Sequence, residues 1–355
     1  MKTLVTILAA FCLMTNALFA TVRTVSNHSV GGAQYSGLQA AYNASGPGDT
    51  LIMEGTDVPY FMECGQAFNK PLTLIGIGFN PNKQIPKRTK IRLTDCWGEL
   101  RILTGASGSQ FYGIEFINNV WSQDQALSNL VFEDCKFNTH CNFGCAPANN
   151  FAFRNCIFDG DNQVNIRMGE CNNAATGIIA NCVFDGFIEG YGSPFISVTI
   201  DHSLFLRSSI VFNNLYYAQI TNNIFMNSFP ISSAGTFFSN YNNNICRIAG
   251  SFPPFPGNGN TGANNIEGTN PQLAGYTLGS LYSFTHNYHL QPGSAAIGAA
   301  SDMTDIGVHG GYTKFSDQGE SLINPIIRSM SILNTSVASN GTLNVQVHAT
   351  KPDND

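Results

Sequence analysis

Charge is scarce in this sequence. Only 11% of its 355 residues are Asp, Glu, Lys or Arg, against about 25% in an average globular protein. The formal net charge is −6, so the chain has no positive field that would attract the phosphates of a nucleic acid. No glycine-rich nucleotide loop and no Ser/His/Asp arrangement stands out. The composition therefore argues against a nucleic-acid-binding protein.

Long apolar runs are missing too, except at the N-terminus. Met1 to Ala20 begins with Lys2, is apolar from Leu4 to Leu13 and ends in a small residue, which is the pattern of a secretory signal peptide. The apolar stretch is too short to span a bilayer. The sequence therefore predicts a secreted or cell-surface protein that is exported by a bacterial signal peptide. It predicts no transmembrane segment.

What the chain has in abundance is a short repeated phrase. The five clear copies are Phe132–Phe137 (FEDCKF), Phe153–Phe158 (FRNCIF), Ile179–Phe184 (IANCVF), Ile200–Phe205 (IDHSLF) and Ile220–Phe225 (ITNNIF). Their starting positions are separated by 21, 26, 21 and 20 residues. A period of this length indicates a solenoid, in which each unit buries its apolar face against its neighbours.

Each copy must contain a corner. Phe153 and Phe158 cannot share one strand face, because side chains alternate and an offset of five is odd. A one-residue corner at Asn155 resolves this, since Asn adopts the left-handed backbone conformation more readily than most residues. The equivalent corner residues are Asp134, Asn181, His202, Asn222 and Asn243. We therefore predict an all-β fold, a right-handed parallel β-helix, whose corner side chains form a hydrogen-bonded ladder from coil to coil.

Both ends of the repeat region resemble a known family. Leu38-Gln-Ala-Ala41 followed by Gly48-Asp-Thr50 is similar to the opening of pectin-lyase-like β-helix proteins. Leu290 to Gly298 with Asp305-Ile-Gly307 resembles the ending of many secreted bacterial β-helix proteins of undefined function. The resemblance implies a fold and is nearly silent on function, because this fold hosts lyases, hydrolases, adhesins and inert structural proteins.

We expect three parts in the chain. They are the signal peptide (1–20), the β-helix with its caps (21–315) and a C-terminal β-strand extension (316–355). The N-terminal cap is expected to be a helix at Ser36–Ala44 with Ser36 as its N-cap.

The C-terminal extension has two segments, 325–333 and 342–348, that alternate like strands and flank the hairpin-type pair Asn340-Gly341. The two strands could pack against the β-helix or pair with a sheet edge of another molecule, which would permit self-association.

Cysteine has two expected roles. Cys135, Cys156 and Cys182 occupy one inward repeat position and are expected to be buried thiols. Other cysteines lie outside the repeat register and are disulfide candidates in an exported protein. These are Cys64 with Cys96, and two among Cys141, Cys145 and Cys171.

Carboxylates give the candidate site. Asp159 and Asp185 each follow a repeat Phe, so they are expected to stack on adjacent coils. Two such carboxylates could begin a turn, hold Ca²⁺, or act on a glycosidic bond. Arg167 lies between them in the sequence, and a lyase of this fold needs a basic residue beside acidic ones. The further binding candidates are Asp161, Glu189, Asp201 and Tyr191.

Exposed aromatic residues could also stack on sugar rings, or could fill loop clusters instead. The candidates are Trp97, Trp121, Tyr191, Tyr216 and Tyr217.

No catalytic signature of the resembled family is present. The sequence has no Asp-Asp pair and no Gly-His-Gly. We therefore expect a non-catalytic scaffold, structural or associated with an extracellular polysaccharide, that requires no cofactor. The alternatives are a polysaccharide lyase or glycoside hydrolase acting on an acidic polysaccharide, with Ca²⁺ as an option, and a self-assembling surface or filament subunit.

Overall fold

A computed structural model describes most of the chain between residues 20 and 350. The described residues are 20–28, 32–80, 87–93, 98–122, 124–160, 163–206, 210–226, 235–253, 258–313, 315–316, 326–332 and 340–350. The predicted signal peptide therefore lies outside them, apart from its last residue, and so do Cys96, Trp97 and Asp161. Among the described helices, none has both the length and the apolar character needed to cross a membrane.

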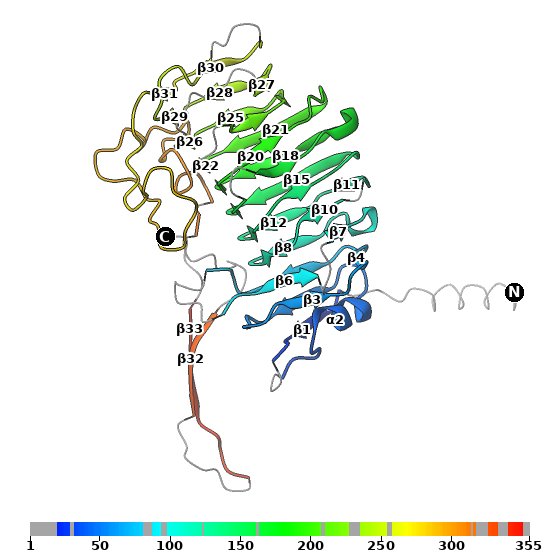
Figure 1. Cartoon of the computed structure of the whole chain (residues 1–355). Coiled ribbons are helices and arrows are strands. Elements are labelled where there is room, and N and C mark those ends of the chain that lie inside the picture. The colour runs from blue at the N-terminus through cyan, green and yellow to red at the C-terminus, as the bar shows by residue number, and fades with distance from the viewer. Residues whose placement is uncertain are drawn as a thin grey trace, which may run out of the picture.

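The chain forms the predicted right-handed parallel β-helix, with about nine turns (Figure 1). One long sheet runs the length of the solenoid. Its path is β1 (Val22–Val25), β2 (Thr50–Met53), β5 (Thr73–Ile75), β8 (Gln110–Tyr112), β12 (Val131–Glu133), β15 (Ala148–Arg154), β18 (Ala175–Ala180), β21 (Ile196–Asp201), β25 (Gln219–Thr221), β28 (Asn240–Asn242) and β30 (Thr261–Ala263), with β11 (Leu127–Ser128) also paired to β15.

Two further sheets close the coils. The second sheet has the order β3 (Tyr60–Met62), β6 (Lys90–Leu93), β9 (Glu115–Phe116), β13 (Lys136–Phe137), β16 (Ile157–Phe158), β19 (Val183–Phe184), β22 (Leu204–Phe205), β26 (Ile224–Phe225), β29 (Ile245–Cys246) and β31 (Ile266–Glu267). The third sheet has the order β4 (Ala67–Phe68), β7 (Leu100–Ile102), β10 (Val120–Trp121), β14 (Cys141–Asn142), β17 (Val164–Arg167), β20 (Phe187–Glu189) and β23 (Phe212–Asn213). A short pair, β24 (Leu215–Tyr216) and β27 (Thr236–Phe237), stands apart from these sheets.

The predicted corner joins the long sheet to the second sheet. Asp134, Asn155 and Asn181 have φ values of 52°, and His202 has 43°. Each is therefore in the left-handed region, where Asn and Asp are favoured among residues with a side chain. The corner residue lets the repeat phrase bend once, so that both of its aromatic ends reach the interior.

The interior is built from stacked phenylalanine rings. On the second sheet, the rings of Phe137, Phe158 and Phe184 are parallel, with centroids 4.8 Å apart at both steps. On the long sheet, Phe132 and Phe153 stack at 5.0 Å. The two stacks meet edge to face, as between Phe153 and Phe158 at 5.4 Å. Both offset-parallel and edge-to-face pairs are favourable aromatic arrangements.

The prediction that the corner side chains form a hydrogen-bonded ladder is wrong. Where the structure describes them, these side chains do not bond to one another from coil to coil. Asn181 donates from Nδ2 to the carbonyls of Val308 and Gly310, at 2.9 Å each. The Asn155 amide makes no hydrogen bond within the described residues. A ladder does form one position further on, where Asn223 and Asn244 are buried inside the solenoid. Asn223 donates to Asn244 Oδ1 at 3.0 Å, and Asn244 repeats this contact to the next coil.

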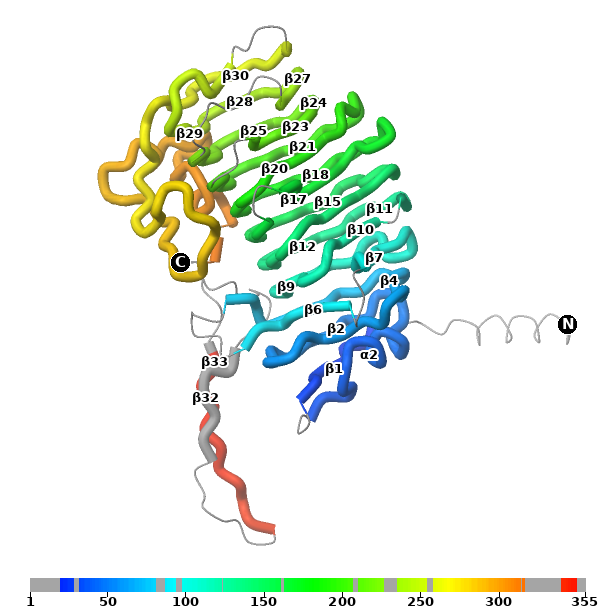
Figure 2. Tube along the Cα trace, viewed as in Figure 1, coloured from blue at the N-terminus to red at the C-terminus, as the bar shows by residue number. Residues whose placement is uncertain are grey.

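Residues 271–316 cover the outer face of the second sheet (Figure 2). The outward residues Ile157, Val183 and Leu204 are completely buried beneath this segment. On the two preceding coils the same position holds Lys136 and Glu115. The column therefore changes from charged to apolar residues between Lys136 and Ile157, and the two charged side chains are buried as well.

The two ends of the described chain differ in packing. Helix α2 (Leu38–Ala44) covers the first coil and buries Leu38, Ala41 and Tyr42. Its N-cap is Gly37, which makes no side-chain cap, so the assignment of Ser36 as N-cap is wrong by one residue. At the other end, β32 (Ile326–Ile332) and β33 (Val345–Thr350) pair antiparallel and project away from the solenoid (Figure 1).

We predict that Phe158→Ala lowers the free energy of unfolding by about 3–5 kcal/mol, because it removes a fully buried ring from the middle of a stack. Phe158→Leu should cost less, since it leaves a smaller cavity. Urea denaturation would measure both. The control is Phe61→Ala on β3, where the ring is 40% exposed, and an equal loss in that variant would contradict the role assigned to the stack.

Candidate functional site

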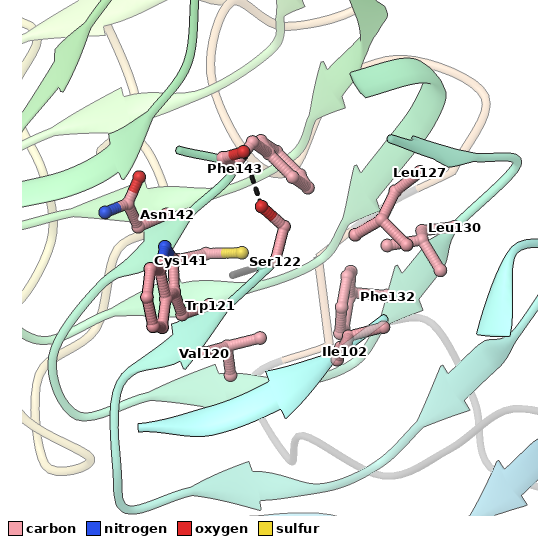
Figure 3. A pocket seen from close by; sticks show the side chains of 10 residues that line it. All are labelled: Ile102, Val120, Trp121, Ser122, Leu127, Leu130, Phe132, Cys141, Asn142 and Phe143. Atoms are coloured by element: carbon pink, nitrogen blue, oxygen red, sulfur yellow. Dashed lines mark hydrogen bonds between the residues drawn. The ribbon is translucent and has the colours of Figure 1, made fainter. Parts of the chain in front are cut away.

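One column of large and polar side chains follows the outer face of the third sheet. Strand register places the outward residues of successive coils next to one another. In order along the solenoid they are Arg101, Trp121, Asn142, Arg167, Glu189 and Asn213. Figure 3 shows Trp121 and Asn142 side by side, pointing away from the interior cluster that contains Leu127 and Phe132.

The sequence candidates Arg167, Glu189 and Tyr191 meet in this column. Arg167 Nε lies 2.9 Å from Glu189 Oε2, and Asn213 donates to the other carboxylate oxygen at 2.8 Å. The Arg167 guanidinium also lies 5.2 Å from the centre of the Tyr191 ring, a cation–π contact. The cation and the carboxylate therefore neutralise one another at the surface.

Beside the column is an open groove, here called the turn groove. It follows the turns between the second and third sheets and consists of two hollows that share Asn119. One hollow, of about 490 Å³, is lined by Glu99, Arg101 and Trp121. The other, of about 390 Å³, is lined by His140, Asp159 and Gln163. The turn groove thus combines an indole, amides and groups of both charges.

His140 and Glu99 face each other where the two hollows meet. His140 Nε2 lies 3.8 Å from Glu99 Oε1, and both side chains are partly exposed. Burial lowers the pKa of His140, and the positive charge of Arg167 lowers it further. At neutral pH the imidazole is therefore held mainly in its neutral form, which can accept a proton.

The register places the two carboxylates on adjacent coils, as expected, but their surroundings differ. Asp159 lines the turn groove but is ion-paired with Lys136, whose Nζ lies 2.7 Å from Asp159 Oδ2. Asp185 follows it on the next coil and is completely buried. Both oxygens of Asp185 accept from the backbone N–H of Tyr282, at 2.9 and 2.8 Å. The covering segment therefore uses Asp185 as an anchor and keeps it away from any ligand in the groove.

Asp201 also belongs to the attachment of the covering segment. Its carboxylate contacts His202 Nδ1 at 2.9 Å, Thr221 Oγ1 at 2.7 Å and Asn222 Nδ2 at 2.9 Å. His202 Nε2 in turn lies 3.3 Å from Thr304 Oγ1. His202 is thus a buried corner residue that holds down the segment.

Ca²⁺ binding remains a prediction. In the part of the chain that the structure describes, no three His, Cys, Asp or Glu side chains are grouped so that they could hold a metal ion. Asp161, the candidate that follows Asp159 in the sequence, lies outside the described residues.

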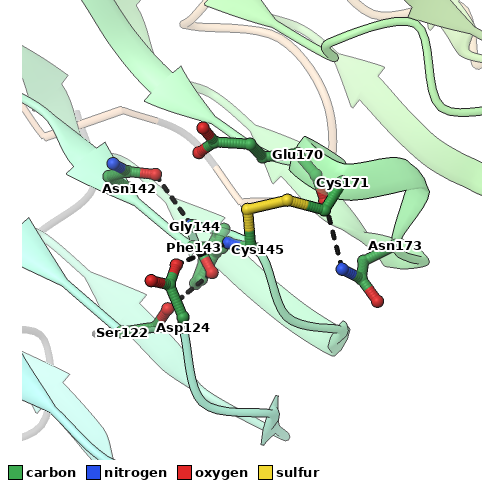
Figure 4. The surroundings of a disulfide bond; sticks show 9 residues. All are labelled: Ser122, Asp124, Asn142, Phe143, Gly144, Cys145, Glu170, Cys171 and Asn173. Carbon is green, nitrogen blue, oxygen red and sulfur yellow. Dashed lines mark hydrogen bonds between the residues drawn. A yellow bond between two sulfur atoms is a disulfide. The ribbon is translucent and has the colours of Figure 1, made fainter.

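The cysteines divide into linked and unlinked groups. Cys145 and Cys171, one of the pairs left open by the sequence, form a disulfide with a Cα–Cα distance of 5.1 Å (Figure 4). It ties together two turns at the edge of the third sheet. Cys135, Cys156 and Cys182 are buried thiols, and burial raises the pKa of Cys135 and Cys156. The pairing of Cys64 with Cys96 remains a prediction because Cys96 is outside the described residues.

Sequence reasoning missed four residues of the groove: Glu99, Arg101, Asn119 and His140. The sequence repeat could have identified two of them. Asn119 and His140 each stand three residues after the aromatic residue that ends a repeat phrase, Phe116 and Phe137. Because the repeat fixes the coil, this shared offset places them on neighbouring turns.

Comparison with known proteins adds a likeness of fold. No protein-family model and no curated protein matches the chain. Among solved structures, a pectate lyase, Pel9A, matches with 15% identity and a TM-score of 0.47 over 81% of this chain and 96% of that one. A pectin methylesterase from Aspergillus niger matches with 14% identity and a TM-score of 0.34 over 81% and 94%. A PL6 family alginate lyase, AlyGC, matches with 13% identity and a TM-score of 0.20 over 75% and 57%. The parallel strand pairing itself shows the parallel β-helix that the sequence predicted.

We predict an acid-dependent contribution from Asp201. Burial raises its pKa, but the hydrogen bonds from His202, Thr221 and Asn222 outweigh burial, so the pKa lies below its ordinary value. A depressed carboxyl pKa stabilises the fold above the ordinary carboxyl range, and this contribution is lost as the pH falls through the folded-state value. The gap in thermal midpoint between the wild type and Asp201→Asn should therefore be constant above about pH 4 and shrink below it.

Thermal scans from pH 6 to pH 2.5 would measure this gap. Thr221→Val removes one hydrogen bond to Asp201 and should make the acid loss begin at a higher pH. A difference in thermal midpoint between wild type and Asp201→Asn that stays unchanged below about pH 4 would contradict the prediction.

Proposed function

We propose that this is an exported β-helix protein that binds an extended carbohydrate chain in the turn groove without cleaving it. The observation that supports the proposal is the groove itself, two hollows joined at Asn119 along the turns of neighbouring coils. Its lining suits a sugar chain: Trp121 offers an apolar ring, and Asn119 and Gln163 offer donors and acceptors for hydroxyl groups.

The solenoid gives the groove its rigidity. Trp121 stands on β10, whose backbone is paired on both sides, with β7 and β14. The neighbouring side chains of the column are therefore fixed at the spacing of the strands, about 4.8 Å. A binding surface that is already ordered loses little conformational freedom when a ligand binds.

Binding without cleavage is supported by the ion pairing and burial of the charged groups that the sequence proposed as catalytic. Asp159 is paired with Lys136, and Arg167 with Glu189, while Asp185 is buried under Tyr282. A glycosidase needs two carboxyl groups on opposite sides of the scissile bond. The sequence candidates are not arranged in this way.

A second candidate function, cleavage of the bound chain, is favoured by one feature. His140 is held neutral in an open groove beside Glu99, and a neutral imidazole there could act as a general base. Incubation with pectate and alginate would test this, through absorbance from unsaturated products and through new reducing ends. Activity lost in His140→Ala would establish cleavage, whereas no activity in the wild type would support binding alone.

We predict that Trp121→Ala weakens carbohydrate binding about tenfold, or about 1.4 kcal/mol, because a buried aromatic contact dominates most small binding surfaces. Affinity electrophoresis in gels containing pectate or alginate would measure the change. These uronate polymers are chosen because two of the similar structures are named as lyases of pectate and alginate.

The matched control is Tyr312→Ala, which removes a fully exposed aromatic ring from the covering segment. It should bind as the wild type does. Equal mobility of the wild type in every gel, with or without polysaccharide, would refute carbohydrate binding in the groove.

A further inference from the structure

A second left-handed corner recurs on the side of the solenoid where the chain enters the long sheet. Its residues have positive φ on six coils, and the residue types differ between coils. They are Gly108 (85°), Asn129 (55°), Asn150 (54°), Tyr217 (52°), Phe238 (50°) and Gly259 (66°). The same backbone contact is made on three of these coils: the N–H of Asn129 donates to Asn149, that of Tyr217 to Phe237 and that of Phe238 to Asn258.

Tyr217 and Phe238 are the exceptions in this column. Gly has no Cβ to clash in the left-handed region, and Asn is tolerated there, whereas a bulky residue is a genuine outlier. The other four coils use Gly or Asn, so the fold does not require an aromatic residue at this corner. Backbone strain of this kind persists where a function maintains it.

The residue before each corner changes on the same two coils. Tyr216 and Phe237 are register partners, whereas the corresponding residues on the earlier coils, Ser128 and Asn149, are small and polar. Aromatic residues therefore replace the small or polar ones in pairs, with Tyr-Tyr on one coil and Phe-Phe on the next. We call these four rings, Tyr216, Tyr217, Phe237 and Phe238, the aromatic patch.

The aromatic patch is ordered and open to solvent. Tyr216 stacks on Phe237 with centroids 4.7 Å apart, and Tyr217 on Phe238 at 5.5 Å. Tyr217 is 43% exposed and Phe238 is 55% exposed. The Phe238 ring lies over Gly259, where any side chain would collide with it. The patch is carried by β24 and β27 and their corners, at the end of the solenoid away from α2 (Figure 2).

The two coils that carry the patch are rich in amides, and Glu189 on the preceding coil is ion-paired with Arg167. From Ser208 to Cys246 the sequence contains no Asp, Glu, Lys, Arg or His. Asn214 and Gln219, on the same coil as Tyr216 and Tyr217, are exposed. An amide offers a donor and an acceptor together, as the two phenol groups also do. These groups match the hydroxyls of an uncharged ligand and offer no counter-ion to a charged one.

The size of the patch favours a narrow ligand over a protein. A stable protein interface takes about 20–30 residues from each partner. Here the aromatic side chains end after two coils, and the corner residue on the next coil is Gly259. A single sugar chain needs only a few stacked contacts of this kind.

We infer that the aromatic patch is a second binding site, separate from the turn groove, that takes a neutral carbohydrate chain. Aromatic rings contact the apolar faces of the sugars, and the neighbouring amides and phenols bind their hydroxyls. The strained corners present the rings to solvent on these two coils.

The test is the double variant Tyr217→Asn/Phe238→Asn, which places at each corner the residue that Asn129 and Asn150 already supply. Because Asn suits the left-handed conformation, the thermal midpoint should equal or exceed that of the wild type. Retardation of the full chain in gels containing soluble xylan, mannan or hydroxyethylcellulose should fall at least tenfold for the polysaccharide that retards the wild type. The control Tyr312→Ala, which removes an exposed ring outside both surfaces, should leave this retardation unchanged.

Three results would overturn the inference. The first is a stable double variant that is retarded by every neutral polysaccharide as strongly as the wild type, and the second is a wild type that none of them retards. The third is a change of molar mass in light scattering between wild type and double variant, which would make the patch a contact between copies of the chain. The reverse variant, Asn150→Tyr, should lower the thermal midpoint and leave binding unchanged, because it adds the strain on a coil without the patch.

Discussion

The structure depends on one packing constraint, the continuous stack of phenylalanine rings around a left-handed corner. Parallel pairing sets successive coils about 4.8 Å apart, which is also the separation of the Phe137, Phe158 and Phe184 ring centroids. A coil that lost its ring would leave a gap on both sides. The left-handed corner, Asn155 in the second copy, is what brings both apolar ends of each phrase into the interior. The repeat phrase therefore recurs at regular intervals because each coil within the stack must supply a ring.

The second sheet has two buried faces, and this decides where a ligand can bind. Its inner face carries the phenylalanine stack, and its outer face carries Ile157 and Val183 under residues 271–316. Asp185 anchors that segment directly, and the partly exposed Asp201 contacts His202, which in turn contacts the segment. Two open surfaces on the described residues are the third sheet with its turn groove and the corner that bears the aromatic patch. Both lie on the flanks that the segment leaves uncovered.

The two open surfaces differ in chemistry. The turn groove carries charges of both signs, many of them paired, with Trp121 and several amides. The aromatic patch has no charge in its sequence neighbourhood and presents stacked rings. A stiff solenoid can hold two such surfaces in a fixed relation because neighbouring coils share one backbone hydrogen-bond network. A charged and a neutral stretch of carbohydrate could be held by one molecule in this way.

The sequence by itself determined the fold, because a solenoid is specified by contacts between equivalent residues of adjacent repeats. The period, the corner at Asn155 and the buried thiols of Cys135 and Cys156 could all be read from spacing and residue type. Only the tertiary structure decided the fate of the charged residues. Asp185 meets Tyr282, 97 positions further along the chain, and no local pattern encodes a contact at that separation. The turn groove likewise joins side chains from different coils, and the sequence does not show which of them a covering segment buries.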